Sequence, residues 1–183
     1  FIRLYPDIRD RTKSEGDFVM NRPIIGPLNK TTVDESTDAY DTIDWLVKNV
    51  PESNGRVATI GGSYDGYTTV MSTVRPHPAL KAAVPFAPMV DGWIGDDFYH
   101  NGAFRQDGMF QYTYDQEATR EGKLKWWSGV YDSYDELLRA GNAGNFAASR
   151  GLEQLGFWRA VSTHTSYDAY WQHQAVDKLL AKE

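Results

Sequence analysis

The sequence predicts an α/β fold with a parallel sheet and a helical second unit, and three observations lead to this prediction. Helix, turn, apolar strand, glycine-rich turn and helix follow one another over residues 34–74, which is the order of a βαβ unit. A second apolar run over residues 80–86 predicts the next buried strand. After residue 90 the aromatic residues become frequent and helical spacing replaces β-branched runs. We therefore expect a sheet core over residues 1–90, a helical insertion over 91–176 and a return to the core over 177–183.

The first part of the chain supplies the expected sheet core. Residues 1–5 form a short apolar run that is typical of a strand, and glycine and proline over residues 11–29 predict an irregular loop. Thr32 and Glu35 have the spacing of a capping box, in which each side chain bonds the other residue's amide. A helix is therefore expected over residues 34–49.

A glycine-rich turn follows the apolar strand that begins near Arg56. It reads Gly-Gly-Ser-Tyr-Asp-Gly-Tyr over residues 61–67, and we expect a sharp passage from strand to helix with Ser63 at the apex. Such a nucleophile elbow presents a serine hydroxyl, while the next backbone N–H, that of Tyr64, faces a developing oxyanion. Glycines are needed there because strand and helix leave no room for side chains. The helix is expected over residues 64–74.

The same turn has two other interpretations, and its spacing leaves them open. Ser63 would be a simple helix N-cap if its hydroxyl bonded the first amides of the helix. Glycine-rich turns also bind phosphate, and Gly61 and Gly66 have the spacing of a P-loop. However, Tyr67 stands where the phosphate-binding lysine would be, and Ser63 replaces the middle glycine of a dinucleotide motif.

Helical spacing beyond residue 90 predicts helices over residues 134–140, 146–155 and 168–182. The aromatic side chains of this region are interpreted mainly as the core of the helical unit, with a minority available to line a pocket.

Composition excludes several functional classes. The chain has 183 residues and a net charge of −6, and its 19 Lys and Arg residues are scattered, which argues against a nucleic-acid partner. No apolar run is long enough to span a membrane. There are no cysteines, which excludes disulfides, thiolate catalysis and cysteine-bound zinc. No metal-binding spacing occurs, so we expect neither a metal nor a cofactor.

Several longer motifs carry a family resemblance. The elbow reads G-x-S-Y-x-G, and Asp7-Ile8-Arg9 is followed by Ser14-Glu15-Gly16; both patterns resemble the cocaine esterase and X-prolyl dipeptidyl aminopeptidase group of α/β-hydrolases. Of the two resemblances, the closer is to the α-amino acid ester hydrolases, which acylate β-lactam nuclei. The further segments that match them are residues 26–29, 41–46, 50–57, 76–81 and 88–93.

The resemblance implies part of an α/β-hydrolase fold with an inserted helical cap. It implies that Ser63 is the nucleophile and that the N–H of Tyr64 is one oxyanion donor. Substrates of this family carry a free α-ammonium group that is held by three carboxylates. By position in the Gly95-Asp96-Asp97 segment, the resemblance assigns one of these carboxylates to Asp97. A desolvated ammonium group does need several opposed charges nearby.

A serine nucleophile also needs a histidine base and an acid, in the order serine, acid, histidine for this fold. The chain offers His77, His100, His164 and His173. The first two precede any plausible acid strand, and the last two fall in the predicted helical cap, where a structural role is favoured. We therefore expect the acid and the base outside residues 1–183, in the remainder of a longer hydrolase.

The sequence thus predicts a serine hydrolase or acyltransferase that acts on α-amino acid esters and amides through an acyl-enzyme, including β-lactam acylation and hydrolysis. The alternatives are a general carboxylesterase, an X-prolyl peptidase of the same group, or a non-catalytic α/β-hydrolase module that binds a ligand. The expected partners are a small amino ester or β-lactam and the rest of the hydrolase, without nucleic acid or membrane. A homo-oligomer is compatible with the resemblance, which also favours a periplasmic or secreted protein over a cytoplasmic one.

Overall fold

The computed structural model describes residues 1–120 and 132–182, which fall into two compact units. The sheet unit comprises Phe1–Leu4, Arg22–Asp96 and Tyr167–Glu183, and the helical unit comprises Tyr5–Asn21 and Asp97–Ser166. Each unit is described by itself below. The predicted domains, over residues 1–90, 91–176 and 177–183, include residues 121–131 and 183, which lie outside the described residues. This domain assignment stays a prediction.

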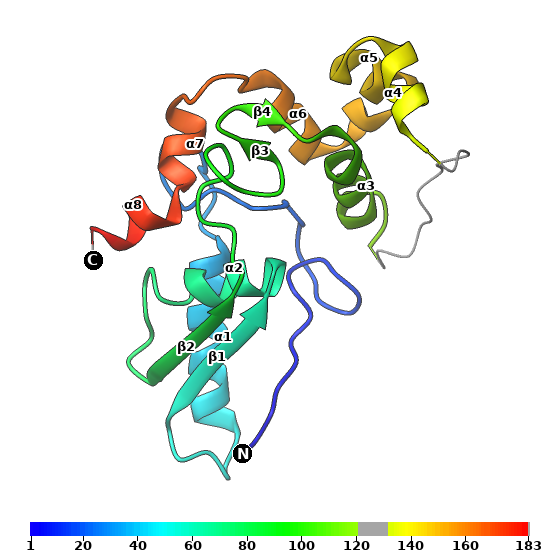
Figure 1. Cartoon of the computed structure of the whole chain (residues 1–183). Helices are drawn as coiled ribbons and strands as arrows, with labels where there is room; N and C mark the ends of the chain where they lie inside the picture. Colours follow the sequence, from blue (N-terminus) through cyan, green and yellow to red (C-terminus); the bar gives the residue numbers. More distant parts are fainter. Residues whose placement is uncertain (121–131, 183) are drawn as a thin grey trace. The chain divides into compact units, whose positions relative to one another are not determined.

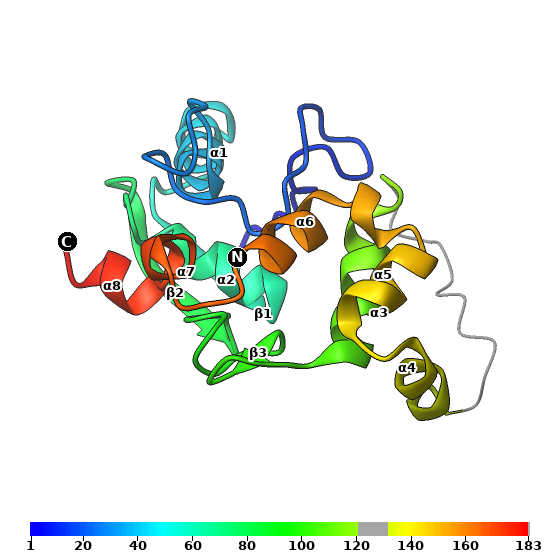
Figure 2. The same ribbon diagram turned by 90° about the horizontal axis from the view of Figure 1, so that it is seen from above.

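The described part of the sheet unit contains one short parallel sheet and four helices. Strands β1 and β2 pair in parallel, with Ile60 opposite Val84 and Gly62 opposite Phe86, which confirms the predicted parallel arrangement. Helix α2 contacts both strands and α1 contacts α2, as the two views show (Figures 1 and 2). The elements are α1 (Glu35–Asn49), β1 (Val57–Gly62), α2 (Tyr64–Met71), β2 (Leu80–Phe86), α7 (Ala169–Gln174) and α8 (Val176–Leu180).

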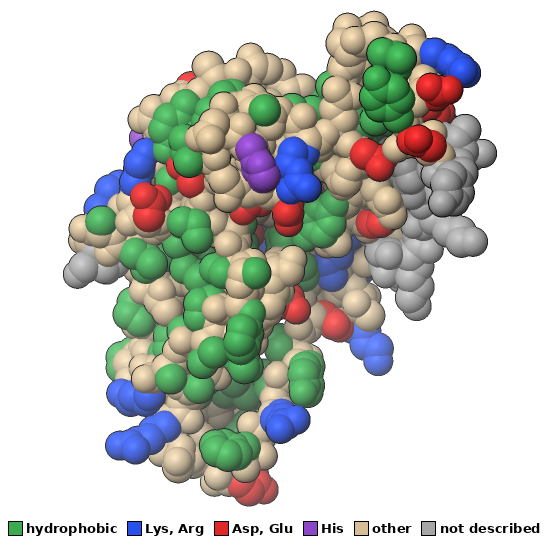
Figure 3. All heavy atoms as spheres, in the orientation of Figure 1, with side chains coloured by type: hydrophobic (Ala, Val, Ile, Leu, Met, Phe, Trp, Pro, Cys, Tyr) green, Lys and Arg blue, Asp and Glu red, His purple; other side chains and the backbone are tan. Residues whose placement is uncertain are grey.

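The prediction of a buried second strand is wrong for the described residues. Strand β2 is mainly exposed, and β1 alternates between half-buried and exposed positions. The solvent-exposed fractions of Ile60, Val84 and Phe86 are 69%, 42% and 56%. In the space-filling view, apolar side chains are exposed over these strands (Figure 3). The physical reason is that the described sheet has only two strands, so few neighbours are present to cover its apolar side chains.

The predicted capping box is displaced by two residues. Helix α1 begins at Glu35, and Asp34 is its N-cap, whose carboxylate accepts the N–H groups of Ser36 and Thr37. Thr37 completes the box, because its hydroxyl accepts the N–H of Asp34 at 2.9 Å. A carboxylate at the N-cap satisfies two amides and also favours the positive end of the helix dipole. The helix itself is confirmed over nearly its whole predicted length.

Residues 1–5 do not form the predicted strand. They lack regular structure, and Phe1, Ile2, Leu4 and Tyr5 are exposed. A strand requires a neighbour to share its backbone hydrogen bonds, and the described sheet pairs only β1 with β2.

The helical unit contains mostly short helices. The helix predicted over residues 134–140 is confirmed as α4. The one predicted over 146–155 is divided, because Gly151 adopts a left-handed backbone at φ 70° between α5 and a short 3-10 turn. The one predicted over 168–182 is α7 and α8 of the sheet unit, which part at Ala175. The elements are β3 (Tyr99–His100), β4 (Ala103–Phe104), α3 (Gln106–Glu117), α4 (Tyr134–Ala140), α5 (Ala143–Ser149), the 3-10 turn Leu152–Gln154 and α6 (Gly156–Thr163).

Aromatic rings build the core of the helical unit, as expected for most of them. Phe110 is 1% exposed, and its ring centroid lies 4.9 Å from that of Phe146 and 5.2 Å from that of Trp158. Phe98 packs on Phe157 in the same way, at 4.9 Å. None of the helices within the described residues has the length and apolar character that crossing a bilayer requires.

Candidate active site

Ser63 occupies the apex between β1 and α2, as the strand-to-helix pattern predicts. Its backbone has φ 56° and ψ −121°, which few residues other than glycine adopt. Two backbone hydrogen bonds of 3.0 Å hold it there, because its N–H donates to the carbonyl of Phe86 and its own carbonyl accepts the N–H of Tyr67. The residue is exposed. A serine thus stands out from the turn in a strained conformation that its neighbours fix.

Two glycines make this turn sterically possible. A Cβ atom on Gly61 would lie 2.3 Å from the carbonyl oxygen of Asp65, and one on Gly66 would lie 2.5 Å from that of Phe86. Both distances are far below van der Waals contact with backbone atoms, which cannot simply rotate away. Gly62 differs, because its nearest neighbour would be the Cβ of Phe86 at an ordinary 3.9 Å. The close approach of strand and helix therefore demands glycine at two positions of the motif.

The geometry also weighs against the two other interpretations of the turn. The side chain of Ser63 makes no capping hydrogen bond, so its hydroxyl is not used to satisfy α2. Asp65 lies in the first turn of the helix. A carboxylate there would repel a phosphate group at the site where a phosphate loop needs to attract one.

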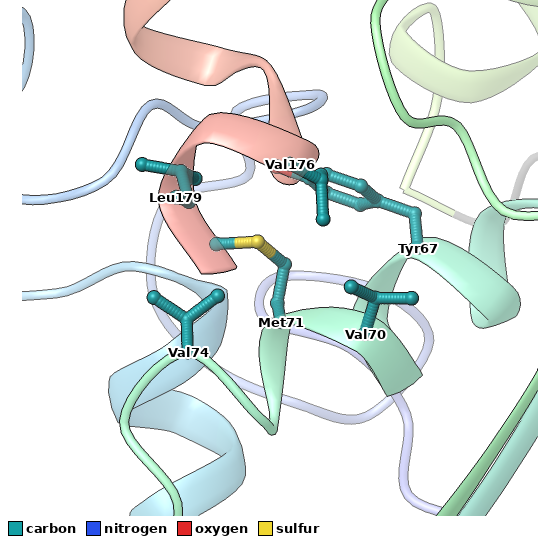
Figure 4. Packing of buried hydrophobic residues seen from close by; sticks show 6 residues of the cluster. All are labelled: Tyr67, Val70, Met71, Val74, Val176 and Leu179. Atoms are coloured by element: carbon teal, nitrogen blue, oxygen red, sulfur yellow. The ribbon is translucent and has the colours of Figure 1, made fainter. Parts of the chain in front are cut away.

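Helix α2 is anchored by a small apolar core on the side away from the strands (Figure 4). Its buried side chains meet Val176 and Leu179 of α8, and Met71 lies at the centre with 1% exposure. The helix and its following turn contribute Tyr67, Val70, Met71 and Val74 to this cluster. Because Ser63 precedes α2 directly, this packing holds the apex of the elbow in place.

Tyr64 is the first residue of α2, so its N–H points from the amino end of the helix. Its ring meets the ring of Tyr67 edge-on, with centroids 6.0 Å apart. The positive end of the helix dipole adds to the attraction of an amide at this place for a developing negative charge.

Asp97 lies in the helical unit, whereas Ser63 lies in the sheet unit, so the structure describes the two residues separately. The side chain of Asp97 is 89% exposed, and its Oδ1 lies 3.2 Å from Nη1 of Arg105. Its neighbour Asp96 belongs to the sheet unit. Such an exposed ion pair contributes about 0–1 kcal/mol, so a competing cation would displace Arg105 at little cost.

The histidines of the chain take different places. The Nδ1 atom of His77 accepts the N–H of Ala79 at 3.0 Å, so its proton sits on Nε2, which lies 3.6 Å from a carboxylate oxygen of Asp44. The ring of Tyr40 packs on it at 4.6 Å. His77 therefore joins α1 to the loop before β2 and has a structural role. His173 lies exposed in the last turn of α7.

No group of three or more His, Cys, Asp or Glu side chains within residues 1–120 and 132–182 is arranged to hold a metal ion. The acidic pair at residues 96 and 97 and the nearby His100 do not form such a site.

The family comparison matches almost the whole chain. The model of the X-Pro dipeptidyl-peptidase family (S15 family) covers residues 1–182. The chain belongs to the S15 family. This match confirms the relationship to the X-prolyl peptidase group that the glycine-rich elbow and the other motifs predicted.

Solved structures support the relationship of this S15 chain in three dimensions. An aminopeptidase from the marine sediment archaeon Thaumarchaeota archaeon is 65% identical, with a TM-score of 0.93, over 97% of this chain and 29% of that one. A selenomethionine-labelled α-amino acid ester hydrolase is 53% identical, with a TM-score of 0.91, over 96% of this chain and 28% of that one. These likenesses confirm the predicted α/β-hydrolase type of fold and the predicted similarity to α-amino acid ester hydrolases.

Two curated mycobacterial proteins are more distant relatives of the S15 chain. One is from Mycobacterium bovis and one from Mycobacterium tuberculosis, and both are provisionally named serine esterases. Each is 30% identical over 127 residues, which is 64% of this chain and 20% of the relative. The match thus covers about a fifth of the length of the curated relatives and less than a third of the length of the solved chains.

Sequence reasoning missed a buried carboxyl group close to the elbow helix. Oε1 of Glu35 accepts the N–H of Arg22 at 3.1 Å, while Oε2 is buried with no hydrogen-bond partner. Burial raises the pKa of Glu35 to about 8, and the same carboxyl contributes to raising the pKa of the buried Tyr67. Asp34 behaves oppositely: burial opposes its ionisation, but hydrogen bonds from Ser36 and two backbone amides lower its pKa. Sequence spacing assigned Glu35 to a capping box and gave no sign of this environment.

Proposed function

We propose that the polypeptide containing this chain is a serine hydrolase and acyltransferase acting on α-amino acid esters and amides, with Ser63 as its nucleophile. The observation that carries the proposal is the elbow. There a strained, exposed serine stands between two sterically required glycines and does not cap its helix. Membership of a peptidase family and similarity to an aminopeptidase and an α-amino acid ester hydrolase support substrates with an α-amino group.

The proposed reaction proceeds through an acyl-enzyme. Oγ of Ser63 attacks the carbonyl carbon while its proton passes to a general base, and the N–H of Tyr64 donates to the resulting oxyanion. Collapse of the intermediate breaks the bond to the alcohol or amine, which leaves with the proton. Water, or the amine of a β-lactam nucleus, then attacks the acyl group and restores the serine. The base and its orienting acid remain predicted outside residues 1–183.

Asp97 is proposed to help bind the substrate ammonium group. Its carboxylate is exposed, and its Oδ1 lies 3.2 Å from the guanidinium of Arg105. A substrate ammonium can take the place of that guanidinium, because the exposed pair contributes little. One carboxylate gives weak binding, so the resemblance to a family with three carboxylates supports further acidic partners in the complete protein.

Labelling with a serine-directed phosphonate tests the nucleophile. In the complete gene product, we expect one modified residue, found by mass spectrometry in the peptide that contains Ser63. Ser63→Ala should abolish both labelling and ester hydrolysis, whereas Ser162→Ala, at an exposed serine of α6, should change neither. Unchanged turnover in Ser63→Ala would refute the proposal, and a protein that is never labelled would favour the non-catalytic binding module.

A plain carboxylesterase is the second candidate function, because the two mycobacterial relatives carry esterase names. The two functions differ in their need for an amino group. Under the leading proposal, Asp97→Asn raises KM about tenfold for phenylglycine methyl ester and leaves KM for methyl phenylacetate unchanged, since an ion pair with the substrate is lost. Asp96→Asn is the matched control. Equal changes for both esters would favour the carboxylesterase.

A further inference from the structure

Two hydroxyl groups join strand β1 to the carboxyl end of helix α2. Oγ1 of Thr59 lies 3.0 Å from Oγ of Ser72, which is the C-cap of the helix and is 2% exposed. The hydroxyl of Ser72 donates its proton to the carbonyl of Thr69 at 2.6 Å. Because a hydroxyl has a single proton, Thr59 is the donor in the bond between the two side chains. We call this contact the Thr59–Ser72 hydroxyl pair.

Thr59 lies on the side of β1 that faces α2. Successive side chains of a strand point to opposite sides, so Thr59 and Gly61 share one side. A Cβ atom on Gly61 would meet the carbonyl oxygen of Asp65 in the first turn of α2, which places this side of the strand against the helix. Ile60 lies on the opposite side and is exposed. The strand therefore contacts α2 near both of its ends, through Gly61 at the start and through Thr59 at the end.

Helix α2 also packs against Val176 and Leu179 of α8 (Figure 4). Helix α8 is itself bonded to the rest of the sheet unit, because Nζ of Lys178 donates to the hydroxyl of Tyr167, which donates to Oδ2 of Asp91, both at 2.6 Å. Burial of apolar side chains is non-directional, whereas a hydrogen bond depends on distance and angle. The apolar cluster therefore holds α2 in place as a whole, and the hydroxyl pair defines its position along β1.

The position of α2 controls the geometry of the elbow. The backbone of Ser63 has a strained φ of 56°, and such a conformation persists only when the surrounding structure fixes it. Its N–H donates to the carbonyl of Phe86 in β2, whereas its carbonyl accepts the N–H of Tyr67 in α2. Movement of α2 relative to the strands would therefore stretch or bend at least one of these bonds. Because Tyr64 begins the helix, its N–H would move with α2.

We propose that Thr59 and Ser72 are positioning residues for the acylation step: their hydroxyl pair fixes α2 against β1, so that Oγ of Ser63 and the N–H of Tyr64 keep the geometry that attack on the substrate carbonyl requires. This inference rests on the proposed function. Both hydroxyls act through α2 and do not touch the substrate. Every residue that carries the inference belongs to the sheet unit. Reacting groups must be held within about 0.5 Å of their productive positions, so a small shift of the helix is enough to slow the reaction.

Kinetics of the complete gene product test this role. Thr59→Val keeps the shape of the side chain and removes the hydroxyl. We expect kcat for phenylglycine methyl ester to fall about fivefold, with KM within about twofold, because the loss concerns the transition state and not substrate binding. The rate constant for labelling of Ser63 by a serine-directed phosphonate should fall by the same factor. Thr59→Ser restores the hydroxyl and should return both values to within about twofold of the wild type.

Ser72→Ala removes the acceptor of the same hydrogen bond and is the second variant. It should lower kcat as Thr59→Val does, and the double variant should lose no more than either single one, since both remove one shared interaction. The matched control is Thr73→Val, because the hydroxyl of Thr73 bonds the carbonyl of Val70 in the last turn of α2. This variant should leave kcat and the labelling rate unchanged.

A purely structural role gives a different result. Thr59→Val and Ser72→Ala would then lower Tm, while kcat and the labelling rate, each counted per phosphonate-reactive molecule, would stay at the wild-type values. That outcome would overturn the inference and leave the proposed function standing, and so would a loss of kcat that Thr59→Ser does not restore or that Thr73→Val shares. Unchanged turnover in Ser63→Ala would overturn both the inference and the proposed function.

Discussion

The elbow of the sheet unit and the aromatic core of the helical unit are stabilised in different ways. At the elbow, backbone meets backbone, and an added methyl group on Gly66 would lie 2.5 Å from the carbonyl oxygen of Phe86. In the helical unit, large rings meet each other at centroid distances of about 5 to 6 Å, as between Phe110 and its aromatic neighbours. The first arrangement admits one residue type, whereas the second depends on volume and tolerates other apolar side chains.

The largest effect is expected at the elbow, where Gly66→Ala pushes β2 away from α2. We expect a loss of more than about 4 kcal/mol of stability, seen as insoluble protein or as a greatly lowered Tm. Gly62→Ala is the matched control, because its Cβ would make an ordinary contact at 3.9 Å. A Tm for Gly66→Ala close to that of Gly62→Ala would contradict the steric account of the elbow.

The aromatic core should show a graded response. Phe110→Ala leaves a cavity among Phe104, Phe146 and Trp158 and should cost about 3–5 kcal/mol. Phe110→Leu refills most of the volume and should cost less than about 1.5 kcal/mol. Urea unfolding followed by tryptophan fluorescence measures both. Equal costs for the two variants would show that this core, too, demands a specific shape.

The smallest of the three effects depends on pH and concerns Glu35. Its folded pKa, about 8, lies above the usual 4.5. Between these values the folded protein keeps a proton that the unfolded chain has lost, so the free energy of unfolding falls as pH rises. Glu35→Gln keeps an acceptor for the N–H of Arg22 and cannot ionise. It should raise stability by about 2 kcal/mol at pH 6 and leave it nearly unchanged at pH 4.5.

Thermal unfolding from pH 4.5 to pH 8 checks this expectation. The matched control is Glu52→Gln, at an exposed carboxyl beyond the end of α1, which should not alter the slope of Tm against pH. A wild-type slope that persists in Glu35→Gln would show that another group causes it.

The elements that sequence predicted correctly are those with local causes. The elbow follows from the glycines around Ser63, and the helix over residues 34–49 follows from apolar spacing and a polar start. Helix α6 was missed because it begins with Gly156, a residue that normally signals a helix end. The carboxylate of Glu117, 40 residues away, accepts the N–H of Phe157 and thereby caps this helix. No local pattern carries that information.

The residues of the candidate site likewise differ in whether a local sequence pattern predicts them. The roles of Ser63 and Tyr64 were predicted from a short motif together with the family resemblance, and that of Asp97 from the resemblance alone. All three roles remain proposals. The hydrogen bond from Tyr167 to Asp91 could not be predicted from sequence, because the two residues lie 76 positions apart in the chain. Sequence therefore predicts reactive residues that lie on one turn, and it misses contacts between residues that are far apart in the chain.

The open apolar side of β1 and β2 has a practical consequence for the bench. Ile60, Val84 and Phe86 are exposed residues of high β-propensity on a sheet of two strands. Such a surface favours concentration-dependent aggregation of the chain. Residues 1–183 purified as a separate piece should therefore scatter light at concentrations where the complete gene product stays clear. Charged residues at these three positions should reduce the aggregation of this fragment and so permit spectroscopy in solution.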